Sequence, residues 1–214
     1  NEPSLVIKSN TNGQIVAIGE EASEMLGRTP EGVSEVAPIR GGAITGFNAT
    51  VSMLKQFMKR VNRGAFVGVR AVIAVPCGIS DVERRAVHEA AHNAGIKTVS
   101  LMDAPLAAAA GCGVDVGAPH GSMVVNLGAG ICEAAVVSLG GIVVSHSVRT
   151  AGTSFDNAIV QHVKKQHSVA IGDSTAEGIK ISIGSVYSGI DRERIEVNGR
   201  DMVTGLPKTA QVTT

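Results

Sequence analysis

The sequence predicts a mixed α/β fold, and three features carry this prediction. Continuous apolar runs over residues 71–75 and 99–102 are typical of buried parallel strands. A helix start signal lies between them, because Ser80 and Glu83 have the spacing of a capping box. Further strand patterns follow one another over residues 123–127, 132–138 and 142–148. Parallel and antiparallel strands are therefore both expected, together with helices.

The first part of the chain predicts a hairpin followed by a helix. Residues 5–7 and 14–18 are short apolar runs, and Asn12-Gly13 between them is a strong hairpin signal. Residues 50–61 place apolar side chains at helical spacing, with Thr50 as the expected N-cap.

The middle of the chain predicts two helices. The helix that Ser80 opens is expected to run to about Ala94 and to stop at Gly95. Pro105 suits the first turn of an alanine-rich helix that continues through Ala110.

The last part of the chain predicts turns, helices and a hairpin. Gly140-Gly141 is expected to join the strands over residues 132–138 and 142–148. Residues 155–165 form an amphipathic helical pattern, and a second capping box at Ser174 is expected to open another helix. The tail over residues 194–214 predicts a β-hairpin with turn signals at Asn198-Gly199 and Gly205-Leu206-Pro207.

The composition of the chain excludes some classes of function. The chain has 214 residues, of which 44% are apolar and 18% charged, so it is globular. Lys plus Arg and Asp plus Glu number 19 each, and aromatics make up 2%, so nucleic acid is not an expected partner. Three cysteines without a CxxC pattern indicate reduced thiols in the cytosol. The chain shows no signal peptide and no initiator Met, so a trimmed sequence or a fragment is expected.

A glycine-rich segment is the first candidate site. Gly128 and Gly130 lie between two predicted strands, and neither has a Cβ, so a phosphate could approach the backbone closely. Taken alone, such a segment is more often only a turn.

The surrounding sequence resembles a known family. Residues 121–130 and 133–145 resemble the second phosphate motif of MreB and Mbl, the bacterial actin homologues that organise cell-wall growth. The resemblance spans nearly the whole chain. Further matching segments are residues 1–4, 19–22, 25–30, 79–86, 175–180 and 199–208.

The resemblance implies an actin-like ATPase (ribonuclease H-like) fold with mixed sheets flanked by helices, incomplete at both termini. The first actin-like half would be residues 1–117, with a small subdomain inserted at about 7–48. The second would be residues 118–214, with a small subdomain at about 156–214.

The resemblance also implies ATP and Mg²⁺ as cofactors, with altered residues in the site. Asn126 matches the aspartate that acts on Mg²⁺ through water, so cation affinity is expected to fall. Ala129 matches a loop glycine between Gly128 and Gly130, and its Cβ is expected to obstruct phosphate or to force an unfavourable φ. Ala104 matches the water-activating glutamate, and alanine cannot act as a base. We expect weak ATP hydrolysis or none, and no catalytic or metal-ligating residue is assigned.

Two further pairs follow from the resemblance. Glu177 and Lys180 match nucleoside contacts, although an exposed ion pair between them explains the same spacing equally well. Phe66 and Val67 match the membrane-touching loop, although Phe66 could instead pack against the protein. The implied role is cell-shape determination, in filaments with itself or with a full-length homologue. The implied location is cytoplasmic, peripheral to the inner face of the cell membrane.

Two alternatives stay open. A fragment of an active, ATP-hydrolysing filament protein would share the same motifs. His88-Glu89-Ala90-Ala91-His92 fits the HExxH pattern of zinc hydrolases. The third histidine of one such class would fall at position 98, which is Thr98, and both histidines are expected to be solvated beside the apolar face of their helix. The zinc hypothesis is therefore the weaker one.

Overall fold

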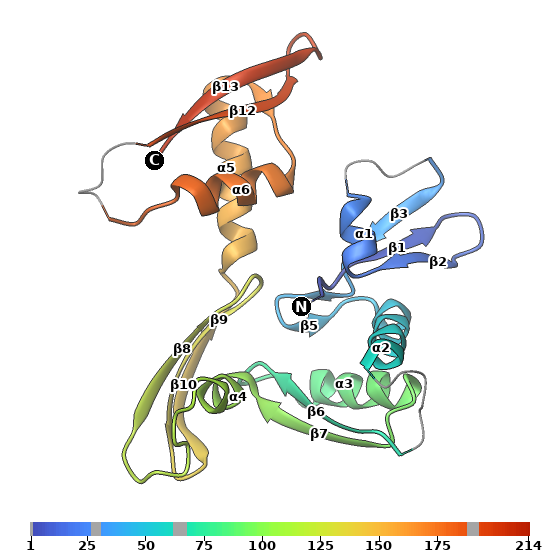
Figure 1. Ribbon diagram of the computed structural model, residues 1–214, viewed down its shortest axis with the longest axis vertical. Coiled ribbons are helices and arrows are strands. Elements are labelled where there is room, and N and C mark those ends of the chain that lie inside the picture. The colour runs from blue at the N-terminus through green and yellow to red at the C-terminus, as the bar shows by residue number, and fades with distance from the viewer. Residues whose placement is uncertain (1, 27–30, 62–67, 188–192) are drawn as a thin grey trace. The chain divides into compact units, whose positions relative to one another are not determined.

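A computed structural model describes residues 2–26, 31–61, 68–187 and 193–214 (Figure 1). The chain forms two compact units. Unit 1 comprises Asn1–Leu127 and Ile131–Arg149, and unit 2 comprises Gly128–Gly130 and Thr150–Thr214. The predicted division into actin-like halves at residue 117 is not tested by these compact units, and it stays a prediction.

Unit 1 begins with a three-stranded antiparallel sheet of order β2-β1-β3. Its strands are β1 (Val6–Ser9), β2 (Ile15–Ile18) and β3 (Val33–Val36), and α1 (Glu20–Glu24) follows β2. Gly13 has a φ of 70° in the β1–β2 turn, which confirms the predicted hairpin.

Helix α2 (Phe47–Val61) packs Met53 against Val6 and Ile18 of this sheet. The short strands β4 (Ile39–Arg40) and β5 (Ala43–Ile44) precede it. The prediction of Thr50 as an N-cap was wrong. The helix begins three residues earlier, and the buried Thr50 hydroxyl instead donates to the Gly46 carbonyl at 2.9 Å.

A parallel β–α–β segment follows, as predicted. Strands β6 (Arg70–Val75) and β7 (Thr98–Asp103) pair in parallel, with α3 (Asp81–Asn93) between them. The capping box at Ser80 is formed, and Gly95 has a φ of 98° just beyond the helix. The strands are less buried than predicted, because Val72 is 65% exposed in a sheet that has two strands among the described residues.

The rest of unit 1 is α4 and a second three-stranded antiparallel sheet. Helix α4 (Ala104–Gly111) has Pro105 in its first turn, as predicted. The sheet has the order β10-β9-β8 and consists of β8 (Ser122–Leu127), β9 (Cys132–Ser138) and β10 (Gly141–Val148). Its second turn is Leu139-Gly140, not Gly140-Gly141. Leu139 and Gly140 have positive φ, as a type I′ turn requires, whereas Gly141 already pairs with Ser138.

Unit 2 packs two helices on a three-stranded sheet (Figure 1). The helices are α5 (Gly152–His167) and α6 (Asp173–Ile183), and the sheet contains β11 (Val169–Ala170), β12 (Arg194–Asp201) and β13 (Pro207–Thr213) in that order. The core includes Val163 of α5, Ile179 of α6 and Val197 of β12. No helix in the described ranges has both the length and the apolar character needed to cross a membrane.

Two local predictions in unit 2 were wrong. Helix α6 begins after Gly172 without a side-chain cap, so the second capping box is not formed. Gly199 lies within β12 rather than in a turn, and a Cβ there would sit 2.4 Å from the Ala170 carbonyl oxygen. Glycine is required at this position by the close approach of β11. The hairpin itself is confirmed, and its turn contains Gly205, with a φ of 74°.

Candidate functional site

The loop Gly128–Gly130 belongs to unit 2, where it is held against the start of α5. The Gly152 N–H donates to the Gly128 carbonyl at 3.2 Å, and the Thr153 N–H donates to the Ala129 carbonyl at 2.8 Å. Among the described residues, the N–H groups of Ala129 and Gly130 donate no hydrogen bond. The loop therefore offers two adjacent free backbone donors, which is the feature that an anion needs.

The backbone of this loop is not strained. Ala129 is exposed and does not have a positive φ, so the expected unfavourable conformation was wrong. The loop turns without using the left-handed region, and alanine is accommodated there for that reason. Obstruction of a phosphate by the Ala129 Cβ stays a prediction.

Lys180 of α6 approaches the same end of α5. Its Nζ lies 3.5 Å from the Gly152 carbonyl oxygen, and 2.8 and 3.0 Å from the two carboxylate oxygens of Asp156. Both side chains are largely removed from solvent, with exposed fractions of 26% for Lys180 and 13% for Asp156. The loop, the start of α5 and one oriented ammonium group are thereby brought together within unit 2.

Asp156 was missed from the sequence. Asp156 stands directly beside apolar positions in the helical pattern over residues 155–165. A polar residue that stays in solvent would be expected on the opposite face of the helix, so this placement could have indicated a buried carboxylate. The partnership with Lys180 replaces the exposed Glu177–Lys180 ion pair that the spacing also allowed. Glu177 is exposed and forms no ion pair with Lys180 in the described part of the chain.

The remaining site positions lie in unit 1. Asn126 is half-buried near the end of β8, where it pairs in register with Glu133 of β9. Ala104 is the first residue of α4, and Asp103 ends β7. Position 104 thus presents a methyl group at the start of a helix and supplies no base.

Glu133 is a second residue that was missed. It is 1% exposed, and its Oε1 accepts the Cys77 N–H at 2.8 Å. The Ser147 hydroxyl donates to the Cys77 carbonyl at 3.2 Å, so both backbone groups of Cys77 are held by side chains. The alternation of side chains along β9 could have indicated its burial, because Glu133 faces inward on the same side of the strand as Ala135 and Val137.

Burial raises the pKa of the Cys77 thiol above its ordinary value, and the negative charges of Asp103 and Glu133 raise this pKa further. A hydrogen bond with Ser145 opposes the shift. The thiol is therefore kept protonated, which makes it a poor nucleophile. Cys77 serves packing and backbone anchoring here.

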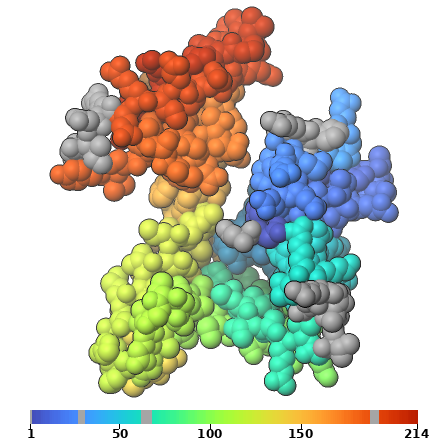
Figure 2. Space-filling view, viewed as in Figure 1, coloured from blue at the N-terminus to red at the C-terminus, as the bar shows by residue number. Residues whose placement is uncertain are grey.

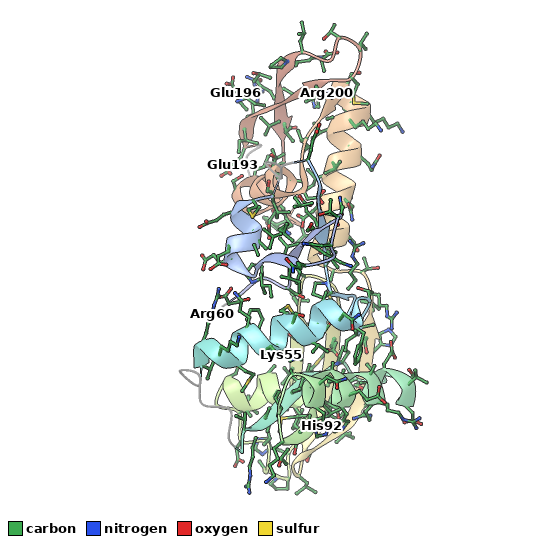
Figure 3. The ribbon with its side chains drawn as sticks, turned by 90° about the vertical axis from the view of Figure 1, so that its right-hand side faces the viewer. Lys55, Arg60, His92, Glu193, Glu196 and Arg200 are labelled. Carbon is green, nitrogen blue, oxygen red and sulfur yellow. The ribbon has the colours of Figure 1, made fainter. Side chains whose placement is uncertain are left out.

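The HExxH pattern does not form a metal site. His88 and His92 of α3 stack with ring centroids 6.5 Å apart, and the His92 Nδ1 lies 3.0 Å from the Ile96 carbonyl oxygen (His92 is labelled in Figure 3). One ring nitrogen of His92 is thus already hydrogen-bonded to a backbone carbonyl just beyond the end of α3. The described residues contain no group of three or more His, Cys, Asp or Glu side chains that could hold a metal ion. The zinc hypothesis is unsupported.

The predicted membrane-contact residues, Phe66 and Val67, lie outside the described residues. Their role stays a prediction.

Comparison with known proteins supplies the wider context. The family model described as MreB/Mbl protein matches residues 1–214. Among curated relatives, cell shape-determining protein Mbl of Bacillus subtilis (strain 168) is 42% identical over 213 residues, covering 99% of this chain and 64% of its own length. Cell shape-determining protein MreB of Escherichia coli (strain K12) is 43% identical, covering 97% of this chain and 62% of its own length. The chain thus spans just under two thirds of these relatives.

Solved structures agree with this assignment. The crystal structure of MreB 5 of Spiroplasma citri bound to AMPPNP has a TM-score of 0.91 at 32% identity, covering all of this chain and 64% of that one. The MamK double helical filament has a TM-score of 0.76 at 18% identity, over 98% of this chain and 65% of the other, which shows a shared fold. The predicted mixed α/β, actin-like fold is confirmed, and the chain belongs to the MreB/Mbl family.

Proposed function

We propose that this chain is part of a cell-shape-determining, actin-like filament protein that binds ATP and hydrolyses it weakly or not at all. The relatives are named for cell-shape determination, and MamK, which shares the fold, is described as a filament. Similar MreB5 structures are bound to AMPPNP and to ADP. The residues that would contact nucleotide are Asn126, Gly128, Ala129, Gly130, Glu177 and Lys180.

One observation carries the nucleotide part of the proposal. The loop that carries the free N–H groups of Ala129 and Gly130 and the oriented ammonium of Lys180 both contact the start of α5. These are donors without a nucleophile, so they suit binding of a polyphosphate rather than chemistry on it. With alanine at position 104 and asparagine at 126, neither a general base nor a charged partner for hydrated Mg²⁺ is supplied by the matching positions.

Calorimetry with ATP, with and without Mg²⁺, tests this function. We expect binding that depends little on Mg²⁺ and that Lys180→Met weakens about tenfold or more, while Lys164→Met on the exposed side of α5 leaves it unchanged. Phosphate release should stay near background. Robust Mg²⁺-dependent turnover by the unaltered chain would favour the alternative of an active ATPase represented by a fragment.

Assembly and membrane contact are the remaining parts of the proposal. The chain is expected to polymerise with itself or with a full-length homologue, on the cytoplasmic face of the inner membrane. Membrane contact would use Phe66 and Val67, whose apolar side chains together supply a few kcal/mol at best, so that filament avidity is needed for stable attachment. Cosedimentation with vesicles, with Phe66→Ser as the test variant, measures this contact directly.

A further inference from the structure

A groove within unit 1 lies between the first sheet and α2, and the proposed function does not use it. Its volume is about 980 Å³. Figure 2 shows the two surfaces that meet there, with the sheet in blue lying on the cyan surface of α2. The accessible apolar floor of the groove includes Ile15 and Val36 of the sheet and Phe47 of α2. Val6 and Ile18 also line the groove but are 0% and 2% exposed.

The rim of the groove is strongly basic. Lys8, Lys55, Lys59 and Arg60 line it, and among the described residues Glu21 supplies the one carboxylate of the lining. Lys55 and Arg60 are labelled on α2 in Figure 3. A chain with equal numbers of acidic and basic residues therefore concentrates positive charge at this groove.

The basic residues divide into one that is fixed and three that are available. Arg60 forms ion pairs with Glu2 and, at 3.4 Å, with Glu21. Lys8, Lys55 and Lys59 have no ion-pair partner among the described residues. Ser52, Lys55 and Lys59 follow one another at helical spacing along one side of α2, so the available charge forms a row beside the apolar floor.

We propose that this groove binds an acidic, amphipathic segment of a partner protein. Charge complementarity selects the occupant, because an apolar floor with a cationic rim matches a segment that has apolar residues on one face and carboxylates on the other. A concave groove between a sheet and a helix also admits a peptide more readily than it admits the plane of a membrane. The segment would lie along α2, with its carboxylates facing Lys55 and Lys59.

Fluorescence anisotropy with the full chain tests the proposal. The probe is a labelled synthetic helix of about four turns, with leucines on one face and glutamates on the other, and the matched probe carries lysines in place of the glutamates. We expect saturable binding of the acidic probe only, weakened by added salt. The double variant Lys55→Glu/Lys59→Glu should reduce affinity about tenfold or more. The control Lys164→Glu/Lys165→Glu, which changes the same charge on exposed α5 positions, should not.

A second variant tests the apolar floor. Phe47 lines the groove at the start of α2 and is 36% exposed, so Phe47→Ala removes contact area with little effect on the core. Affinity should fall while the circular dichroism spectrum is kept.

The proposal is overturned if neither probe binds, if both bind equally, or if the lysine reversals leave affinity unchanged. It is also overturned if the lysines are needed instead for binding vesicles of anionic lipid, or for a self-associated species seen in sedimentation velocity. Those two results would assign the groove to a membrane or to a second copy of this chain.

Discussion

Replacing Gly199 by alanine is the sharpest test of the packing in unit 2. Gly199 lies in β12, and an added Cβ would sit 2.4 Å from both the Ala170 carbonyl oxygen and the Val169 Cγ1. Real Cβ atoms are not found closer than 3.0 Å, so β11 must move away. Since β11 pairs with β12 through two residues, Val169 and Ala170, this movement would disrupt the pairing of the two strands.

We expect Gly199→Ala to lower the free energy of unfolding by about 1–2 kcal/mol. Overpacking costs roughly 1–3 kcal/mol, and the smaller entropy of the unfolded alanine chain returns part of it. Urea unfolding followed by circular dichroism measures the change, and hydrogen exchange of the β11 and β12 amides assigns it to unit 2.

Gly178 provides the matched control. It lies within α6, has no atom within 4 Å of an added Cβ, and lacks a positive φ. Gly178→Ala should therefore stabilise unit 2 by about 0.5–1 kcal/mol. If Gly199→Ala unfolds like the unaltered chain, or if both variants shift stability in the same direction, the argument from close strand approach is refuted.

Three further predictions concern unit 1. Ser80→Ala removes the cap of α3 and should cost about 1 kcal/mol in urea unfolding, whereas Ser182→Ala, inside α6, should cost less. The hydrogen bond from the Ser80 N–H lowers the pKa of Glu83 below its ordinary value of 4.5. The ionised Glu83 therefore stabilises the fold above about pH 4.5, and this contribution is lost as the pH falls through the lowered pKa. Glu83→Gln should flatten that part of the profile of stability against pH. Glu133→Ala should cost about 1–3 kcal/mol by leaving the Cys77 N–H unpaired, and Glu133→Gln should restore most of it; equal losses in the two variants would contradict the assigned hydrogen bond.

The sequence predicted most elements because their signals are local. The Ser80 capping box, the Asn12-Gly13 hairpin and the strand over residues 132–138 were each decided by a few neighbouring residues. The errors arose where distant contacts decide. Thr50 bonds back to Gly46 inside a longer helix, and Gly199 is glycine because another strand lies against it.

The candidate site divides in the same way. The glycine loop and Lys180 were predicted from the resemblance of their motifs and stay predictions as nucleotide contacts, whereas Asp156 and Glu133 were missed. Their partners are 24 and 56 positions away in the chain, and no window of sequence joins Lys180 to Asp156 or Cys77 to Glu133. Periodicity could have flagged Glu133 as an inward-facing charge, though not its partner.

The loop Gly128–Gly130 has a consequence for the covalent path of the chain. Its flanking strands belong to unit 1, so the backbone passes between the units after Leu127, after Gly130 and after Arg149. A single protease cut after Arg149 would thus leave residues 150–214 without a covalent link to the loop Gly128–Gly130, to which Gly152 and Thr153 donate hydrogen bonds. Because the loop would remain on the fragment that holds residues 1–149, the cut would separate unit 2 from a part of its own fold.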